Sequence, residues 1–137
     1  MITIGWERRF HGRGCAMDWH VEYYKKGNGS IPVLDYLLSL GPKMRAKAFS
    51  EIELLEKHGP SLREPYVKAL SGARYKGMFE LRIRFASNLS RIFYFTYKQR
   101  TFVLLHGFTK KGEHTPGGEL ERALRYRADF ERRCQDE

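Results

Sequence analysis

Cysteine is scarce in this sequence, which has two in 137 residues. Cys15 and Cys134 lie near opposite ends, belong to no CxxC pair and have no histidine at a zinc-ligand spacing, so we interpret them as incidental thiols. Long apolar runs are also missing, and none approaches the roughly 18 residues that span a bilayer. The N-terminus lacks the apolar run and the small-residue cleavage site of a secretory signal. We therefore expect a cytoplasmic protein that has no membrane contact.

Several sequence signatures of catalysis are absent as well. The chain has no GxxxxGK(S/T) or GxGxxG pattern, no HExxH, no GxSxG and no cluster of aspartates. These absences disfavour a nucleotide-phosphate cradle, metal catalysis and a hydrolase nucleophile elbow. The chemistry that remains is that of basic side chains acting on an anionic polymer.

Acidic residues are few in the middle of the chain. The formal net charge is +9, and residues 60–118 carry eleven Lys and Arg against three Asp and Glu. The flanking segments are nearly balanced, with nine against seven in residues 1–59 and five against six in residues 119–137. A basic region focused in this way attracts polyanions, and nucleic acid is the default partner. The alternative is a basic surface that only prevents self-association.

Composition indicates one globular domain, because 42% of the residues are apolar and 14% aromatic. We expect residues 1–16 to be a flexible extension or a misassigned start, and residues 17–137 to form a single domain. Hydrophobic periodicity predicts an α+β fold with the order β-α-α-β-β-β-α. The predicted strands are 18–24, 78–85, 90–97 and 101–108, and the predicted helices run from the Ser30 cap to about Gly41, from Pro42 to Gly59, and over 116–133.

The first two predicted helices have a short connection and form a helical hairpin. The three later strands also have short connections, which favours an antiparallel meander. Residues 60–77 are predicted to be a long basic connection. We expect the hairpin to cover one face of a small sheet and to leave the other face available. The apolar stripes of the hairpin are Leu34, Leu37 and Leu38 on the first helix, and Met44, Ala48, Ile52 and Leu55 on the second.

The segment MFELRIRF carries the first candidate site. Because side chains alternate across a strand, Glu80, Arg82 and Arg84 share the face opposite Phe79 and Leu81. Two guanidiniums beside one carboxylate can bind an anion, and the carboxylate can act as a base or a counterion. An ordinary solvated strand face with a weak salt bridge is the alternative.

The other candidates lie on the next two strands. Arg91 opens an otherwise apolar strand and is placed to hold a phosphate, whereas Tyr94 falls on the opposite face and is expected in the core. Lys110 and Lys111 follow a strand and can contact phosphates or stabilise a transition state, although a solvated turn also explains them. His106 has the intrinsic pKa for proton transfer, but its place inside a strand makes a packed structural role an equal alternative.

Three motifs in chain order carry a resemblance to a known family. They are Phe79-Glu80-Leu81-Arg82, then Ser90-Arg91-Ile92-Phe93-Tyr94, then Leu104-Leu105-His106-Gly107-Phe108-Thr109-Lys110-Lys111 followed by Thr115-Pro116 and Glu119. Together they resemble the HigB-like, phage-derived branch of the RelE toxin superfamily of type II toxin–antitoxin systems. The resemblance runs from about Asp18 to Phe130.

This resemblance implies the RelE-like microbial RNase fold, a small twisted antiparallel sheet with an N-terminal helical hairpin and a C-terminal helix. It implies an endoribonuclease (an mRNA interferase) that cuts messenger RNA on the ribosome and inhibits translation. The implied chemistry is attack by the ribose 2′-hydroxyl on the adjacent phosphate, without a metal or other cofactor. The implied partners are the ribosome, messenger RNA and a cognate antitoxin encoded nearby, often a helix-turn-helix protein.

Five of the candidate site residues match positions of the family: Glu80, Arg82, Arg91, Lys110 and Lys111. We expect catalytic roles for Arg82, Arg91, Lys110, Glu80 and His106, and RNA-binding roles for Arg84, Lys111, Arg74 and Lys76. The family's best-studied branch has a catalytic tyrosine after the last strand, whereas Tyr126 here falls on the final helix. The general acid and base therefore stay open. The alternative function is a non-catalytic nucleic-acid-binding regulator of phage origin.

Overall fold

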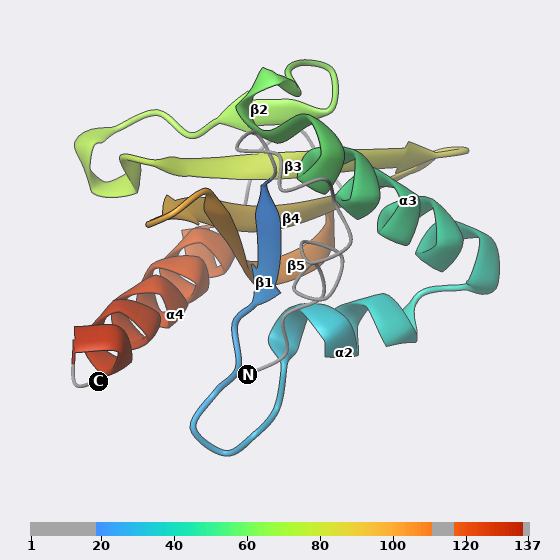
Figure 1. The fold of residues 1–137 in the computed structure, drawn as a ribbon. Coiled ribbons are helices and arrows are strands. Elements are labelled where there is room, and N and C mark those ends of the chain that lie inside the picture. The colour runs from blue at the N-terminus through green and yellow to red at the C-terminus, as the bar shows by residue number, and fades with distance from the viewer. Residues whose placement is uncertain (1–18, 111–116, 136–137) are drawn as a thin grey trace, which may run out of the picture.

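The computed structural model describes residues 19–110 and 117–135, and within them three α-helices pack on one five-stranded sheet (Figure 1). The strand order is β1-β5-β4-β3-β2. This arrangement confirms the α+β class. The elements are β1 (His20–Tyr23), α2 (Pro32–Ser39), α3 (Pro42–His58), β2 (Val67–Ala69), β3 (Met78–Phe85), β4 (Asn88–Tyr97), β5 (Thr101–Lys110) and α4 (Gly117–Gln135), with short 3₁₀ helices at Gly59–Ser61 and Ala73–Tyr75.

Local sequence explains the boundaries that were predicted well. Strand β3 has the predicted bounds, and its side chains alternate between the two faces. Helix α3 begins at Pro42, whose fixed φ suits the first helical turn. It ends at Gly59, which has a φ of 58° and donates its N–H to the Leu55 carbonyl. A residue without a Cβ adopts that left-handed conformation at no steric cost.

The sheet differs from the expectation in two ways. Strand β2 lies inside the segment that was predicted to be a connection, and its three residues are too few to give a periodic signal. Strand β1 pairs in parallel with β5, so the sheet is mixed and is antiparallel only from β2 to β5. Sequence spacing cannot supply this pairing, because β1 and β5 are separated by most of the chain.

The first helix also differs in detail. Ile31, not Ser30, is the N-cap residue, and it makes no side-chain cap bond. Ser30 instead donates its backbone N–H to the Asn28 side chain in the preceding turn. Leu38 is 56% exposed, so the predicted stripe is wrong at that position. Val33 and Leu37, four residues apart, supply the buried face of α2.

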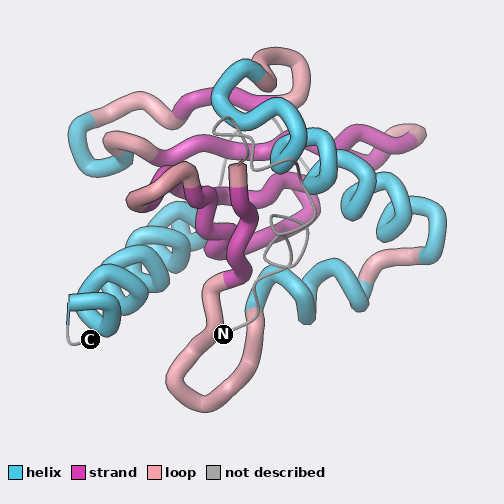
Figure 2. The backbone as a smooth tube through the Cα atoms, viewed as in Figure 1, coloured by secondary structure: helices cyan, strands magenta, loops and turns pink. Residues whose placement is uncertain are grey.

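Apolar clusters lie on both faces of the sheet. The first joins α2 and α3 to alternate residues such as Leu81, Ile92 and Tyr94, and the four predicted residues of the α3 stripe are all buried in it. Tyr94 is therefore in the core, as expected. The second cluster joins Ala123 and Phe130 of α4 to the opposite face (Figure 2). Each fully buried large aliphatic or aromatic side chain contributes roughly 1.5–3 kcal/mol.

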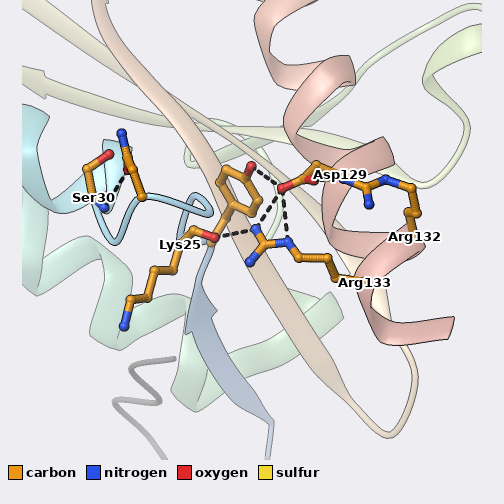
Figure 3. Close-up of polar contacts among 7 residues, drawn as sticks. Lys25, Ser30, Asp129, Arg132 and Arg133 are labelled. Carbon is orange, nitrogen blue, oxygen red and sulfur yellow. Dashed lines mark hydrogen bonds and ion pairs between the residues drawn. The ribbon is translucent and has the colours of Figure 1, made fainter. Parts of the chain in front are cut away.

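The C-terminal end of α4 is fixed beside the end of β1. Tyr24 donates its hydroxyl proton to Asp129 at 2.6 Å, and Arg133 bonds both Asp129 and the Lys25 carbonyl (Figure 3). Burial and Asp129 raise the pKa of Tyr24 to about 12. The second face is thus only partly available, because α4 covers the portion nearest these contacts. None of the helices in the described ranges is long and apolar enough to cross a membrane.

Residues 1–16, Lys111 and the Thr115-Pro116 cap lie outside the described residues.

Candidate functional site

The strand register sorts the α4 face of the sheet into rows that cross β3, β4 and β5. One row is Met78, Phe95 and Val103, and the next is Glu80, Phe93 and His106; apolar residues of both rows pack in the cluster with α4. The following rows are Arg82, Arg91 and Phe108, then Arg84, Leu89 and Lys110. The charged residues are therefore concentrated toward one end of this face.

A cavity of about 470 Å³ lies at this end of the sheet. It is bounded by β3, β4, the end of β5 and the segment that contains β2. Five of its lining side chains are basic and one is acidic, so the cavity attracts anions. The lining residues are Lys68, Ala69, Leu70, Ser71, Glu80, Arg82, Arg84, Leu89, Arg91 and Lys110.

A buried ion pair forms the inner wall of this basic cavity. Nη1 of Arg91 donates to both carboxylate oxygens of Glu80, at 3.0 and 2.8 Å. The two side chains are only 8% and 3% exposed. Charge-assisted hydrogen bonds of this kind are strong and directional. Glu80 therefore holds the Arg91 guanidinium in a fixed orientation at the wall of the cavity.

Arg82 stands directly across the strand pair from Arg91. Two guanidiniums beside one carboxylate leave an excess positive charge at the cavity wall. The Nε atom of Arg82 is buried and makes no hydrogen bond to the part of the chain that the structure describes. A buried donor without an acceptor costs free energy.

The comparison with protein families fits this geometry. The family described as phage-derived protein Gp49-like (DUF891) matches residues 35–128, which include every lining residue of the basic cavity. The match spans more than half of the chain. The chain belongs to the Gp49-like family. Members of this family are phage-derived, toxin-like proteins of toxin–antitoxin loci. No curated protein matches the chain.

Five predicted site residues of this Gp49-like protein thus come together. Glu80, Arg82, Arg84, Arg91 and Lys110 belong to three different strands and line one cavity. Lys68 was missed, because β2 was not predicted. No periodic signal marks this strand, because it has only three residues.

His106 lies away from the basic cavity. It is 7% exposed, its Nε2 contacts Glu119 of α4, and its ring stacks on Phe108, the register partner of Arg91. Burial lowers the pKa of His106; Glu119 opposes that shift, and Arg122 and Arg125 add to it. This environment fits the packed structural role that the sequence left open.

Arg74 and Lys76 line a second, smaller cavity of about 290 Å³ between the Ala73–Tyr75 turn and α4. Arg74 pairs with Glu121 of α4 at 2.8 Å, and Arg127 donates to the Lys76 carbonyl at 2.7 Å. Arg74 and Lys76, two of the four predicted RNA-binding residues, therefore do not line the basic cavity of this Gp49-like chain.

Proposed function

We propose that this protein is a RelE/HigB-like toxin, a ribosome-dependent endoribonuclease that cleaves messenger RNA and arrests translation. One observation carries the proposal: five basic side chains and one buried carboxylate, brought together from four strands, line one cavity on the sheet. Phosphodiesters of a nucleic acid are anions that a focused basic cavity attracts. Membership of a family of toxin-like proteins supports the same conclusion.

The proposed reaction needs the 2′-hydroxyl to be aligned with the phosphorus and the negative charge on the phosphate oxygens to be stabilised. It uses no cofactor. The ribose 2′-oxygen bonds to the adjacent phosphorus, the bond from phosphorus to the 5′-oxygen breaks, and a proton moves from the 2′-hydroxyl toward the leaving oxygen. The products are a 2′,3′-cyclic phosphate and a 5′-hydroxyl. Arg82 and Arg91 neutralise the charge that grows on the phosphorane oxygens, and such preorganised charge is commonly the largest catalytic contribution.

Glu80 has a positioning role in this mechanism. Both of its oxygens accept a hydrogen bond from Nη1 of Arg91, so its carboxylate orients the guanidinium. Lys110 and Arg84 stand at the outer row of the cavity and hold the flanking phosphates. Lys68 faces the same space from β2. The partners in this proposal are the ribosome, messenger RNA and a cognate antitoxin that neutralises the toxin.

The test is a purified ribosome system programmed with one defined message. We expect the protein to cut that message in the presence of chelator, to leave 2′,3′-cyclic phosphate ends, and to lose at least 100-fold in rate in R82Q and K110A. The control is K43A, which removes an exposed lysine at the start of α3, away from the basic cavity. Uncut message with the folded wild-type protein, or full rates in both cavity variants, would overturn the proposal.

A second function is favoured by the composition of the cavity wall. Glu80 is its single carboxylate among the described lining residues, and no histidine or tyrosine lines it there. A non-catalytic nucleic-acid-binding regulator needs the positive charge and no proton-transfer group. Tight binding of RNA with every transcript end intact, on and off the ribosome, would select this function.

A further inference from the structure

Strand β2 is an edge of the sheet, and its ladder shows which backbone groups face outward. Arg82 donates its N–H to the Tyr66 carbonyl at 2.8 Å, and Leu70 donates to the Met78 carbonyl at 3.0 Å. In an antiparallel ladder, the backbone N–H and C=O groups of every second residue point toward the neighbouring strand. These two bonds therefore show that the backbone groups of residues 66, 68 and 70 face β3. The N–H and C=O of Ala69 and the C=O of Val67 therefore point to the outer edge.

Strand β2 also separates two hollows of opposite character. On the α4 face lies the basic cavity. On the other face lies a mostly apolar groove of about 570 Å³, whose floor is the aromatic row Phe79, Tyr94 and Phe102. Lys68 and Ala69 line both hollows. One edge strand thus borders an apolar surface and a cationic surface at once.

We propose that the outer edge of β2 binds an extended segment of a partner protein whose side chains alternate between apolar and acidic. A peptide that pairs with this edge continues the sheet, so its successive side chains point to opposite faces. Those on one side lie beside Val67, Ala69 and Phe79 over the apolar groove. Those on the other side lie beside Lys68 over the basic cavity, where carboxylates complement the charge.

A protein segment fits this edge better than RNA does. The outward N–H and C=O groups match a peptide backbone, and the groove side offers aromatic and aliphatic surface, where Glu64 partly offsets the charges of Arg63 and Lys68. This inference rests on the proposed function. The partner would act as a regulator, because its acidic side chains at the basic cavity would neutralise the cations that hold phosphates. An antitoxin segment of this chemistry would therefore block RNA while it binds.

The direct test uses synthetic six-residue peptides and the full chain, without RNA. The probe alternates Glu and Val, and its matched control has the same composition in two blocks, three Glu followed by three Val. Backbone amide NMR shifts give the affinity and the location. We expect shifts at Val67–Leu70 and at least ten-fold weaker binding of the block peptide, because only the alternating peptide places each residue type on its own face.

Two variants test the backbone edge itself. A69P removes an N–H that points outward, so it costs no bond to β3, and proline is tolerated at such edge positions. A69V keeps that N–H and adds bulk to the side chain. We expect A69P to weaken the alternating peptide at least ten-fold and A69V to weaken it by less than three-fold, with thermal unfolding confirming that both variants fold.

Equal affinity for the two peptides, or unchanged binding by A69P, would overturn the inference. It would also fail if an oligouridylate, and not the alternating peptide, shifted the amides that border the groove. Failure here is distinct from failure of the proposed function. A chain that binds the peptide but cuts no message contradicts only the nuclease, and one that cuts messages but ignores the peptide contradicts only this edge site.

Discussion

Nη1 of Arg91 lies 2.8 Å from Oε2 and 3.0 Å from Oε1 of Glu80, and both side chains are almost completely buried. The same ion pair therefore contributes to the stability of the sheet and to the charge at the cavity wall. A buried carboxylate that keeps its partner is tolerated, whereas one that loses it is costly. Arg91 therefore cannot be removed as a simple test of catalysis.

The first prediction concerns this ion pair. We expect R91A to lower the free energy of unfolding by about 3–5 kcal/mol, because Glu80 stays buried without its cation. The double variant E80Q/R91Q removes both charges and should be clearly more stable than R91A. Urea unfolding of the three proteins measures this, and a double variant as unstable as R91A would contradict the explanation.

The second prediction concerns the exposed end of the cavity. Arg84 is exposed and lines the cavity, so its removal should weaken RNA binding without unfolding the chain. Each phosphate contact to a single strand contributes a slope of about 0.7 to the dependence of log K on log salt. We expect R84A to reduce that slope by roughly 0.7. Anisotropy titrations of labelled RNA over a salt series test it, with K43A keeping the wild-type slope.

The third prediction concerns the pH dependence of stability. Burial lowers the pKa of His106 in the folded chain, so the unfolded chain binds a proton first as the pH falls. The contribution of this residue is therefore complete above its unfolded pKa of about 6.5 and declines as the pH drops toward the lower folded value. H106Q should flatten the decline in melting temperature between neutral and mildly acidic pH.

The control for that experiment is L38Q, which changes an exposed residue of α2 and neither adds nor removes a titratable group. It should keep the wild-type pH profile. A profile in H106Q that is as steep as in the wild type would show that other groups control acid stability. A large loss of RNA cleavage by folded H106Q would instead restore the catalytic role that the sequence suggested.

The sequence predicted much of this site because alternation along a strand is a local property. The pattern that places Glu80 and Arg82 on one face of β3 is visible in eight residues, and so is the opposite placement of Tyr94 and Arg91 on β4. Their assembly needed only that the strands be neighbours, which short connections favour. Arg82 and Arg91 accordingly lie side by side.

The parts that were missed depend on contacts between distant segments. The environment of His106 includes Glu119, which reaches it only when α4 folds back on the sheet. Lys68 enters the cavity because the short strand β2 pairs with β3. The parallel pairing of β1 with β5 joins segments about eighty residues apart. No periodicity within a single segment encodes such pairings.

The last prediction concerns the packing of α2 against β5. Tyr36 of α2 lies over Gly107, and a Cβ at that glycine would meet its ring at 2.6 Å. The Tyr36 hydroxyl bonds to Ser90 and Thr109, which neighbour Arg91 and Lys110 in the chain. G107A must therefore displace the ring, and overpacking of this kind costs about 1–3 kcal/mol.

The matched control is G27A, because a Cβ at Gly27 meets nothing within 4 Å. We expect thermal unfolding to show a lower melting temperature for G107A and little change for G27A.

Displacement of Tyr36 also breaks the hydroxyl contacts that tie β4 to β5 near the arginines. RNA binding should then weaken in G107A at temperatures where it is still folded. If G107A melts like the wild type, the ring is not fixed by its contacts with Ser90 and Thr109, and the α2 face does not hold the cavity strands in place.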